Sequence, residues 1–334
     1  MNLFHRLAIL CLVATTGLMA AAAQPYESKQ GVYEYVVRSA EGSLDSIAKA
    51  VGDSLDNSGW NLVTTLTPGA PESCGYESRV VLAFRPSYSN VVVRANAKTG
   101  PFGFLDRVNV FEDENGIHVS VVNQRNIIRT VLMNDNGYDG FVHQHMDALR
   151  AAINSAVVGS PGEAQYGQFR SRGYIGRTMG VMAGGRFDGK VEDIIVVDGA
   201  TLDDVASLVE QRLSQPGPKW GTNLSFRLDL PEHGAVLFGT TGTPLDSKSF
   251  QIVGAGSDGA RDDFACPGLA HAGAYPLEVV VTETNEGIAI RMVDAMYRMK
   301  MYFEDAGKIA FMKNMTMPGS IAGEIENKVT TVGT

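Results

Sequence analysis

One five-residue apolar stripe occurs twice in this chain, and each residue of the second copy stands 158 positions after its counterpart. Apolar residues at this spacing predict an amphipathic helix. A hydroxyl residue that can cap a helix N-terminus precedes each stripe, Ser43 before the first and Thr201 before the second. A tandem duplication is therefore predicted. The two stripes are Leu44, Ile47, Ala48, Val51 and Leu55, followed by Leu202, Val205, Ala206, Val209 and Leu213.

The segments around the stripes also match. A strand-like run precedes each stripe, at 32–37 and at 194–197, and the only two tryptophans of the chain, Trp60 and Trp220, follow the predicted helices 44–57 and 202–214. Further along, each half has two strand-like runs separated by a turn with Gly116 or Gly287, which is a hairpin signal. These runs are 108–112 with 117–122, and 279–283 with 288–293.

Each half ends in helical patterning, with Leu149, Ile153 and Val157 in the first and Ile321, Ile325 and Val329 in the second. The order of strand, helix, several strands and helix predicts an α+β fold. We expect two tandem two-layer repeats, each an antiparallel sheet packed against helices. The predicted division is repeat 1 at 32–158, a Gly/Arg-rich connector at 159–192, and repeat 2 at 193–334 with a long insertion at 240–275 that is either a functional lid or a poorly ordered loop.

Residues 1–23 have the pattern of a secretory signal peptide. Arg6 supplies the positive start, residues 7–18 are mostly apolar, and Ala21 to Ala23 offer a small-residue cleavage site. No later segment has enough consecutive apolar residues to cross a bilayer. We expect a soluble periplasmic or secreted protein, cleaved near Ala23.

The formal net charge of the chain is −9. Because phosphate contacts need clustered Lys and Arg, we expect no nucleic-acid partner. Two cysteines remain after cleavage, Cys74 and Cys266. In an oxidising compartment a disulfide between them is favoured over two free thiols, and the chain has no C-x-x-C redox motif.

The C-terminal half resembles the domain of unknown function 302 family. The hairpin from 277–281 to 287–290 and the ending 317–326 carry this resemblance. The N-terminal half is similar but more divergent, and its segment 121–123 and the helix after Gly140 fit the same plan. The resemblance implies a curved antiparallel sheet around a helix, like one half of the TATA-box-binding protein. It implies no established reaction. The long insertion and the methionine content depart from the family pattern.

Methionines cluster in the last part of the chain, with seven in the 26 residues from Met292 to Met317. Clustered thioethers can bind Cu(I) or act as axial haem ligands. Methionine more often fills gaps in a core or lines an adaptable hydrophobic pocket, and that interpretation is favoured here. The predicted ligand-binding residues are Met292, Met296, Met299, Tyr302, Phe311 and Met315.

His143, His145 and Met146 form a weaker metal-site candidate. On an extended segment the two histidines would share a face, whereas on a helix they would diverge, and the following residues look helical. The standard hydrolase, nucleotide and zinc-protease motifs are missing, so we assign no catalytic residue.

Three functions remain open. The favoured one is an exported binding protein with a hydrophobic groove, lined by Met and aromatic side chains, for a small ligand. The alternative is a periplasmic protein that handles copper or haem through Met and His ligands. The third is an enzyme whose residues converge only in three dimensions. The oligomeric state is not predicted.

Overall fold

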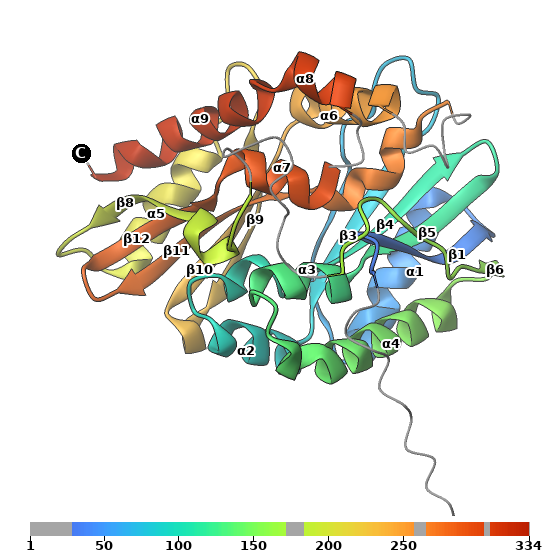
Figure 1. Cartoon of the computed structure of the whole chain (residues 1–334), viewed down its shortest axis with the longest axis horizontal. Helices are drawn as coiled ribbons and strands as arrows, with labels where there is room; N and C mark the ends of the chain where they lie inside the picture. Colours follow the sequence, from blue (N-terminus) through green and yellow to red (C-terminus); the bar gives the residue numbers. More distant parts are fainter. Residues whose placement is uncertain (1–28, 172–183, 257–264, 304–307, 334) are drawn as a thin grey trace, which may run out of the picture.

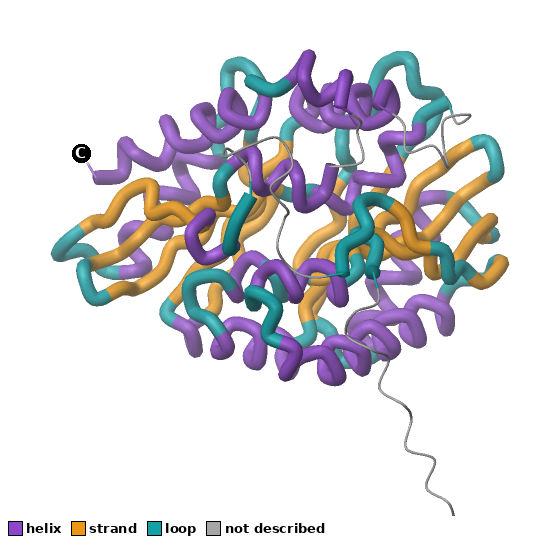
Figure 2. Tube along the Cα trace, viewed as in Figure 1, coloured by secondary structure: helices purple, strands orange, loops and turns teal. Residues whose placement is uncertain are grey.

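Two antiparallel sheets form the frame of the protein in the computed structural model (Figure 1), which describes residues 29–171, 184–256, 265–303 and 308–333. The predicted signal peptide at 1–23 lies outside these residues, as do parts of the predicted connector and of the predicted insertion. Helices lie above and below the strands in the view of Figure 2. The predicted α+β class, with antiparallel sheets packed against helices, is confirmed.

The first unit contains five long strands and four helices, with a short 3-10 turn η1 (Gly100–Phe102) after α2. In chain order these elements are β1 (Tyr33–Ala40), α1 (Leu44–Asn57), β2 (Asn61–Leu66), β3 (Ser78–Phe84), α2 (Pro86–Ala95), β4 (Asp106–Asp113), β5 (Gly116–Val122), α3 (Gln124–Val131) and α4 (Asp139–Ala156). The sheet has the order β2-β3-β4-β5-β1, and two short strands from the predicted connector, β6 (Ser160–Pro161) and β7 (Gln165–Tyr166), pair with β1.

The second unit repeats this order of elements. It contains β8 (Val191–Val197), α5 (Leu202–Leu213), β9 (Asn223–Leu230), β10 (Ala235–Thr241), α6 (Thr243–Gly256), the 3-10 helix η6 (Pro267–Ala274), β11 (Leu277–Thr284), β12 (Gly287–Val293), α7 (Ala295–Phe303), α8 (Lys308–Asn314) and α9 (Met317–Val329). Its sheet has the order β9-β10-β11-β12-β8, which is the order of the first sheet with each strand replaced by its counterpart. Part of the predicted insertion, α6, therefore has a counterpart in α2.

The two stripes lie on α1 and α5, the first helix of each unit. Both N-caps are as predicted, since the Ser43 side chain accepts a hydrogen bond from the Ser46 amide and Thr201 accepts one from the Asp204 amide. Every stripe residue of α1 is buried. The sequence repeat is thus matched by the same local structure at the same place in each unit.

Both faces of the first sheet contribute side chains to buried apolar clusters. One face, with Val108 and Val119, packs against α1 and α4 and forms a separate cluster of apolar side chains. The other face contributes Tyr33, Tyr35 and Phe111 to a larger cluster that also contains the side chains between the second sheet and its helices. One continuous apolar core therefore joins the two units.

Covalent and polar contacts also join the units. The predicted disulfide is confirmed, since Cys74 and Cys266 are bonded at 2.03 Å. Asp246 of α6 accepts a hydrogen bond from the amide of Gly69, which lies between β2 and β3. Both contacts attach the β2–β3 loop of the first unit to the β10–β11 connection of the second.

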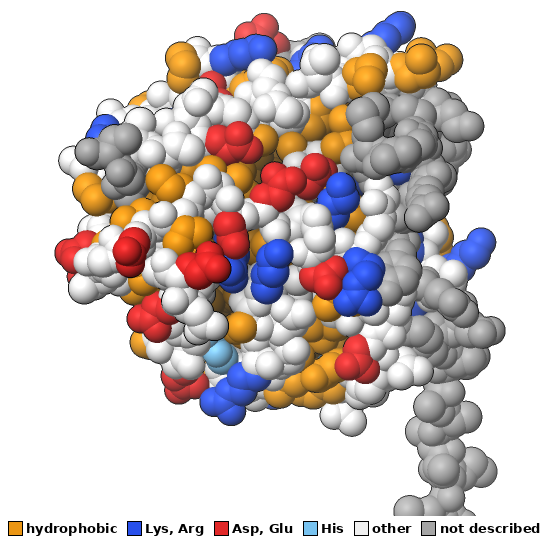
Figure 3. All heavy atoms as spheres, turned by 60° about the vertical axis from the view of Figure 1, so that its left-hand side comes forward, with side chains coloured by type: hydrophobic (Ala, Val, Ile, Leu, Met, Phe, Trp, Pro, Cys, Tyr) orange, Lys and Arg blue, Asp and Glu red, His pale blue; other side chains and the backbone are white. Residues whose placement is uncertain are grey.

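Among the described residues, the helices are too short or too polar to span a membrane. The face in Figure 3 carries acidic and basic side chains interspersed with apolar ones.

Candidate functional site

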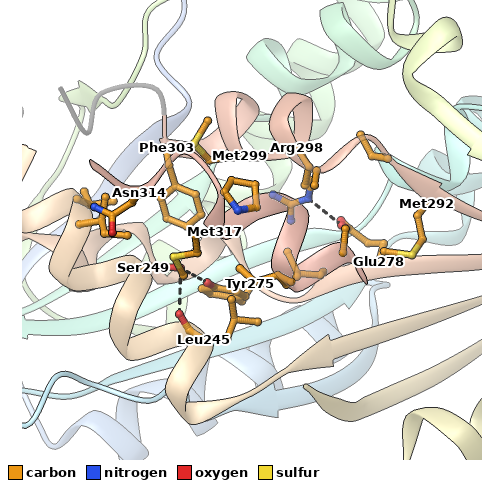
Figure 4. A pocket seen from close by; sticks show the side chains of 18 residues that line it. Leu245, Ser249, Tyr275, Glu278, Met292, Arg298, Met299, Phe303, Asn314 and Met317 are labelled. Carbon is orange, nitrogen blue, oxygen red and sulfur yellow. Dashed lines mark hydrogen bonds and ion pairs between the residues drawn. The ribbon is translucent and has the colours of Figure 1, made fainter. Parts of the chain in front are cut away.

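A pocket opens inside the second unit, between α6, α7, α9 and the adjoining ends of β11 and β12 (Figure 4). Its empty volume is about 880 Å³, which includes the opening to solvent. Pockets between helices of this kind are common sites for small ligands.

Most side chains that line the pocket are apolar. Three of them are thioethers, and they come from three elements: Met292 from β12, Met299 from α7 and Met317 from α9. Phe303 supplies an aromatic wall, and α6 supplies aliphatic groups. The remaining apolar lining comes from Leu245, Ile252, Val253, Leu277, Val293, Ala295, Pro318, Ile321 and Ala322.

The hydroxyl groups in the wall form a short chain. The Tyr275 hydroxyl donates to Ser249 Oγ at 2.7 Å, and Ser249 Oγ donates to the carbonyl oxygen of Leu245 at 3.0 Å (Figure 4). Both hydroxyl hydrogens are therefore used within the wall. Burial raises the pKa of Tyr275 above its usual value, so this group is a neutral phenol.

Charge enters the pocket wall through Arg298 and Glu278. Arg298 Nε donates to Glu278 Oε2 at 3.0 Å, and Nη2 donates to the backbone carbonyls of Ala274 and Pro276. Glu278 Oε1 also forms an ion pair with Arg107 of the first unit. All three side chains are more than nine-tenths buried.

An aromatic ring supports the two guanidinium groups. The Arg298 guanidinium carbon lies 3.8 Å from the centroid of the Tyr302 ring, and that of Arg107 lies 5.1 Å from it. Burial lowers the pKa of Arg107 to about 10 and also lowers the pKa of Arg298. The Arg107 group keeps its charge at neutral pH, because a pKa of about 10 lies well above 7.

The structure brings together some of the predicted ligand-binding residues and not others. Met292 and Met299 line the pocket, whereas Tyr302 packs against the guanidinium groups. Met296 is half-buried outside the lining, and Met315 is exposed. Phe311 belongs to α8, but its side chain lies outside the described part of the structure.

Arg298, Glu278 and Met317 line the pocket but were missing from the predicted site. Met317 could have been predicted from the helical pattern. It precedes Ile321 by one helical turn and therefore lies on the same face of the helix. The charged pair carried no such signal, because Glu278 directly precedes the apolar run of β11 and its arginine partners are remote in sequence.

The three residues of the predicted metal site lie on one helix, α4, and are separated there. His145 Nε2 lies 2.9 Å from both carboxylate oxygens of Asp106, while Met146 is buried in the cluster beneath the first sheet. His143 is half-buried, and burial together with the charge of Arg125 lowers its pKa. In the described part of the chain, three or more His, Cys, Asp or Glu residues nowhere converge as metal ligands would.

Comparisons with known proteins leave the function open. No family model matches the chain, and no curated protein matches it. One similar solved structure is that of an uncharacterized conserved protein DUF302 from Bacillus stearothermophilus, with 12% identity and a TM-score of 0.32 over 37% of this chain and 98% of that chain. At this TM-score the likeness assigns no activity to the chain.

Proposed function

We propose that this protein is an exported binding protein that holds a small hydrophobic molecule in the pocket between α6, α7 and α9. The observation that carries the proposal is the composition of that pocket, in which thioether, aromatic and aliphatic side chains surround a few polar groups. Methionine suits such a site, because its flexible side chain adapts to ligands of different shape.

The test compares two methionine variants. Met299→Ala removes a lining side chain, and Met315→Ala removes an exposed side chain outside the lining. Binding of the neutral fluorophore N-phenyl-1-naphthylamine should weaken roughly five-fold in Met299→Ala, since about 1 kcal/mol of apolar contact is lost. Met315→Ala should bind as the wild type does. Equal affinity of all three proteins, or no binding to the wild type, contradicts the proposal.

Copper or haem handling remains the second candidate, because the three thioethers of Met292, Met299 and Met317 line one pocket. The visible spectrum and the metal content of the purified protein separate the two functions. A Soret band or stoichiometric copper, lost in Met299→Ala, would favour the second.

We also infer that the two units descend from one ancestral unit of the domain of unknown function 302 type. The shared strand order and the paired helix caps support this origin. A homologue with a single unit that aligns with both halves is the expected finding. Export is proposed as well, and the N-terminal sequence of the secreted protein should then begin near residue 24.

A further inference from the structure

The Arg298 guanidinium has one nitrogen that the protein does not use. Nε and Nη2 are engaged by Glu278 and by two backbone carbonyls, but Nη1 makes no hydrogen bond within the described residues. Arg298 is one of the residues that line the pocket, although only 9% of its side chain is exposed. A nearly buried cation thus presents an open donor to a mostly apolar pocket (Figure 4).

The charges around this donor do not balance. Arg107 and Arg298 share the single carboxylate of Glu278, and neither guanidinium has another acidic partner within the described residues. The buried group of three therefore carries one net positive charge. A buried charge without a counter-ion is costly. Binding of an anion in the pocket is therefore more favourable in free energy than binding of the same anion to a cation at a solvated surface.

Other polar groups of the wall are poor candidates for binding a charged ligand. Both Glu278 oxygens accept from arginine, and the hydroxyl hydrogens of Ser249 and Tyr275 are engaged within the wall. Asn314 Nδ2 donates to the carbonyl of Ala310 in its own helix. Among the residues that the structure describes, Arg298 is the one cation in the lining, so the pocket combines a positive point with an apolar body.

We propose that the ligand is a monoanionic amphiphile, a carboxylate with an alkyl chain, whose head group binds Arg298 Nη1 while its chain lies against Met299, Phe303 and Met317. This inference rests on the proposed function, since it names the class of molecule that the same pocket binds. A carboxylate fits because it carries the one negative charge that is missing and pairs well with a guanidinium donor.

The first experiment uses the wild-type protein and three probes with the same twelve-carbon chain: dodecanoate, 1-dodecanol and dodecyltrimethylammonium. Their affinities are measured at about pH 8 by displacement of N-phenyl-1-naphthylamine. Dodecanoate should bind about ten-fold or more tightly than dodecanol, because a charge-assisted hydrogen bond is added. The ammonium compound should bind weakest.

These probes separate the two proposals. Equal or tighter binding of dodecanol or of the ammonium compound would overturn the anionic head group but leave a hydrophobic pocket in place. If none of the three probes binds, the proposed function itself fails.

The second experiment assigns the head-group contact. Arg298→Met leaves Arg107 and Glu278 as a balanced buried pair, and should remove the preference for dodecanoate over dodecanol. Arg291→Met is the control, because Arg291 pairs with Asp193 and lies outside the lining. A preference that persists in Arg298→Met, or that vanishes in Arg291→Met, overturns the assignment to Arg298.

A measurement on the wild type covers the case in which Arg298→Met does not fold. The carboxyl carbon of 13C-labelled dodecanoate is titrated by NMR in the bound state. Beside a guanidinium group, the pKa of the bound carboxyl should lie below that of the free acid. A pKa raised above that of the free acid would mean that the head group is desolvated without a cation, which contradicts the proposal.

Discussion

The two units have the same topology. One place in the fold, however, is filled by side chains in the first unit and is open in the second. Four equivalent positions surround this place: the first residue of the fourth long strand, the first residue of the helix that follows the hairpin, the third residue of the helix that precedes the hairpin, and the residue one turn before the last apolar pattern. They are Asp106, Gln124, Tyr88 and His145 in the first unit, and Leu277, Ala295, Leu245 and Met317 in the second.

In the first unit these side chains form a closely packed polar and aromatic cluster. The His145 ring stacks on the Tyr88 ring with centroids 3.6 Å apart, and His145 Nε2 lies 2.9 Å from the Asp106 carboxylate. Trp60 Nε1 donates to the same carboxylate at 2.7 Å, and Gln124 Nε2 lies 3.4 Å from it. Every member of the cluster is buried.

All four counterparts in the second unit line the pocket. Replacing two large rings with leucine and methionine removes volume, and replacing Asp106 and Gln124 with Leu277 and Ala295 removes the polar groups that would bridge the gap. The same backbone therefore supports a filled core in one unit and an open pocket in the other.

The largest predicted effect concerns an ion pair between the two units, which is formed by residues at equivalent positions. Arg107 and Glu278 are the second residues of β4 and β11, and they pair with each other. Glu278→Gln leaves two buried guanidinium groups without a carboxylate and should lower the free energy of unfolding by about 3–5 kcal/mol. Chemical denaturation measures this loss.

Asp53→Asn is the control for that variant, because Asp53 belongs to an exposed i,i+4 pair with Lys49 and should change stability by about 0.5 kcal/mol or less. If Glu278→Gln costs no more than Asp53→Asn, the two units are not held together by this ion pair.

The next prediction exchanges residues between equivalent positions. Tyr88→Leu should lower the free energy of unfolding by about 2–3 kcal/mol, because removal of the buried ring leaves a cavity in the core of the first unit. Leu245→Tyr places a ring in the pocket and should abolish binding of N-phenyl-1-naphthylamine while stability changes by about 1 kcal/mol or less. Denaturation and fluorophore titration measure both. Retained binding in Leu245→Tyr would show that the pocket is not the binding site.

Local patterns account for what the sequence predicted well. The stripe and cap of α1 and of α5 lie within one segment each, so periodicity is enough to place them. The disulfide between Cys74 and Cys266 followed from the expected compartment and the cysteine count. The strand order of the sheets needed the coordinates, because pairing between strands depends on contacts far apart in sequence.

The candidate site was only half predictable for the same reason. Methionine clustering indicated Met292 and Met299, but the pocket wall comes from six helices and strands, and the charge in it depends on Arg107 from the other unit. The helix α6 was not predicted and falls within the expected insertion, because its apolar pattern does not resemble that of its counterpart α2.

The smallest predicted effect is a pH dependence of stability that arises from a residue of the second unit and has no equivalent in the first. Asp246 is the fourth residue of α6, and its counterpart, the fourth residue of α2, is the uncharged Ser89. Burial raises the pKa of Asp246 from 3.8 to about 7, although the amides of Gly69 and Gly242 oppose the shift. The folded state therefore binds a proton more tightly than the unfolded state does.

It follows that the stabilising effect of this proton is complete below about pH 4 and is lost as the pH rises through about 7. From about pH 5.5 to 7 the free energy of unfolding of the wild type should fall by up to about 2 kcal/mol relative to that of Asp246→Asn, and the difference should level off above pH 7. Ser89→Ala, the same position in the first unit, should follow the wild-type pH dependence. Parallel curves for the wild type and Asp246→Asn would mean that Asp246 does not titrate in this range, and the two units would then not differ in this respect.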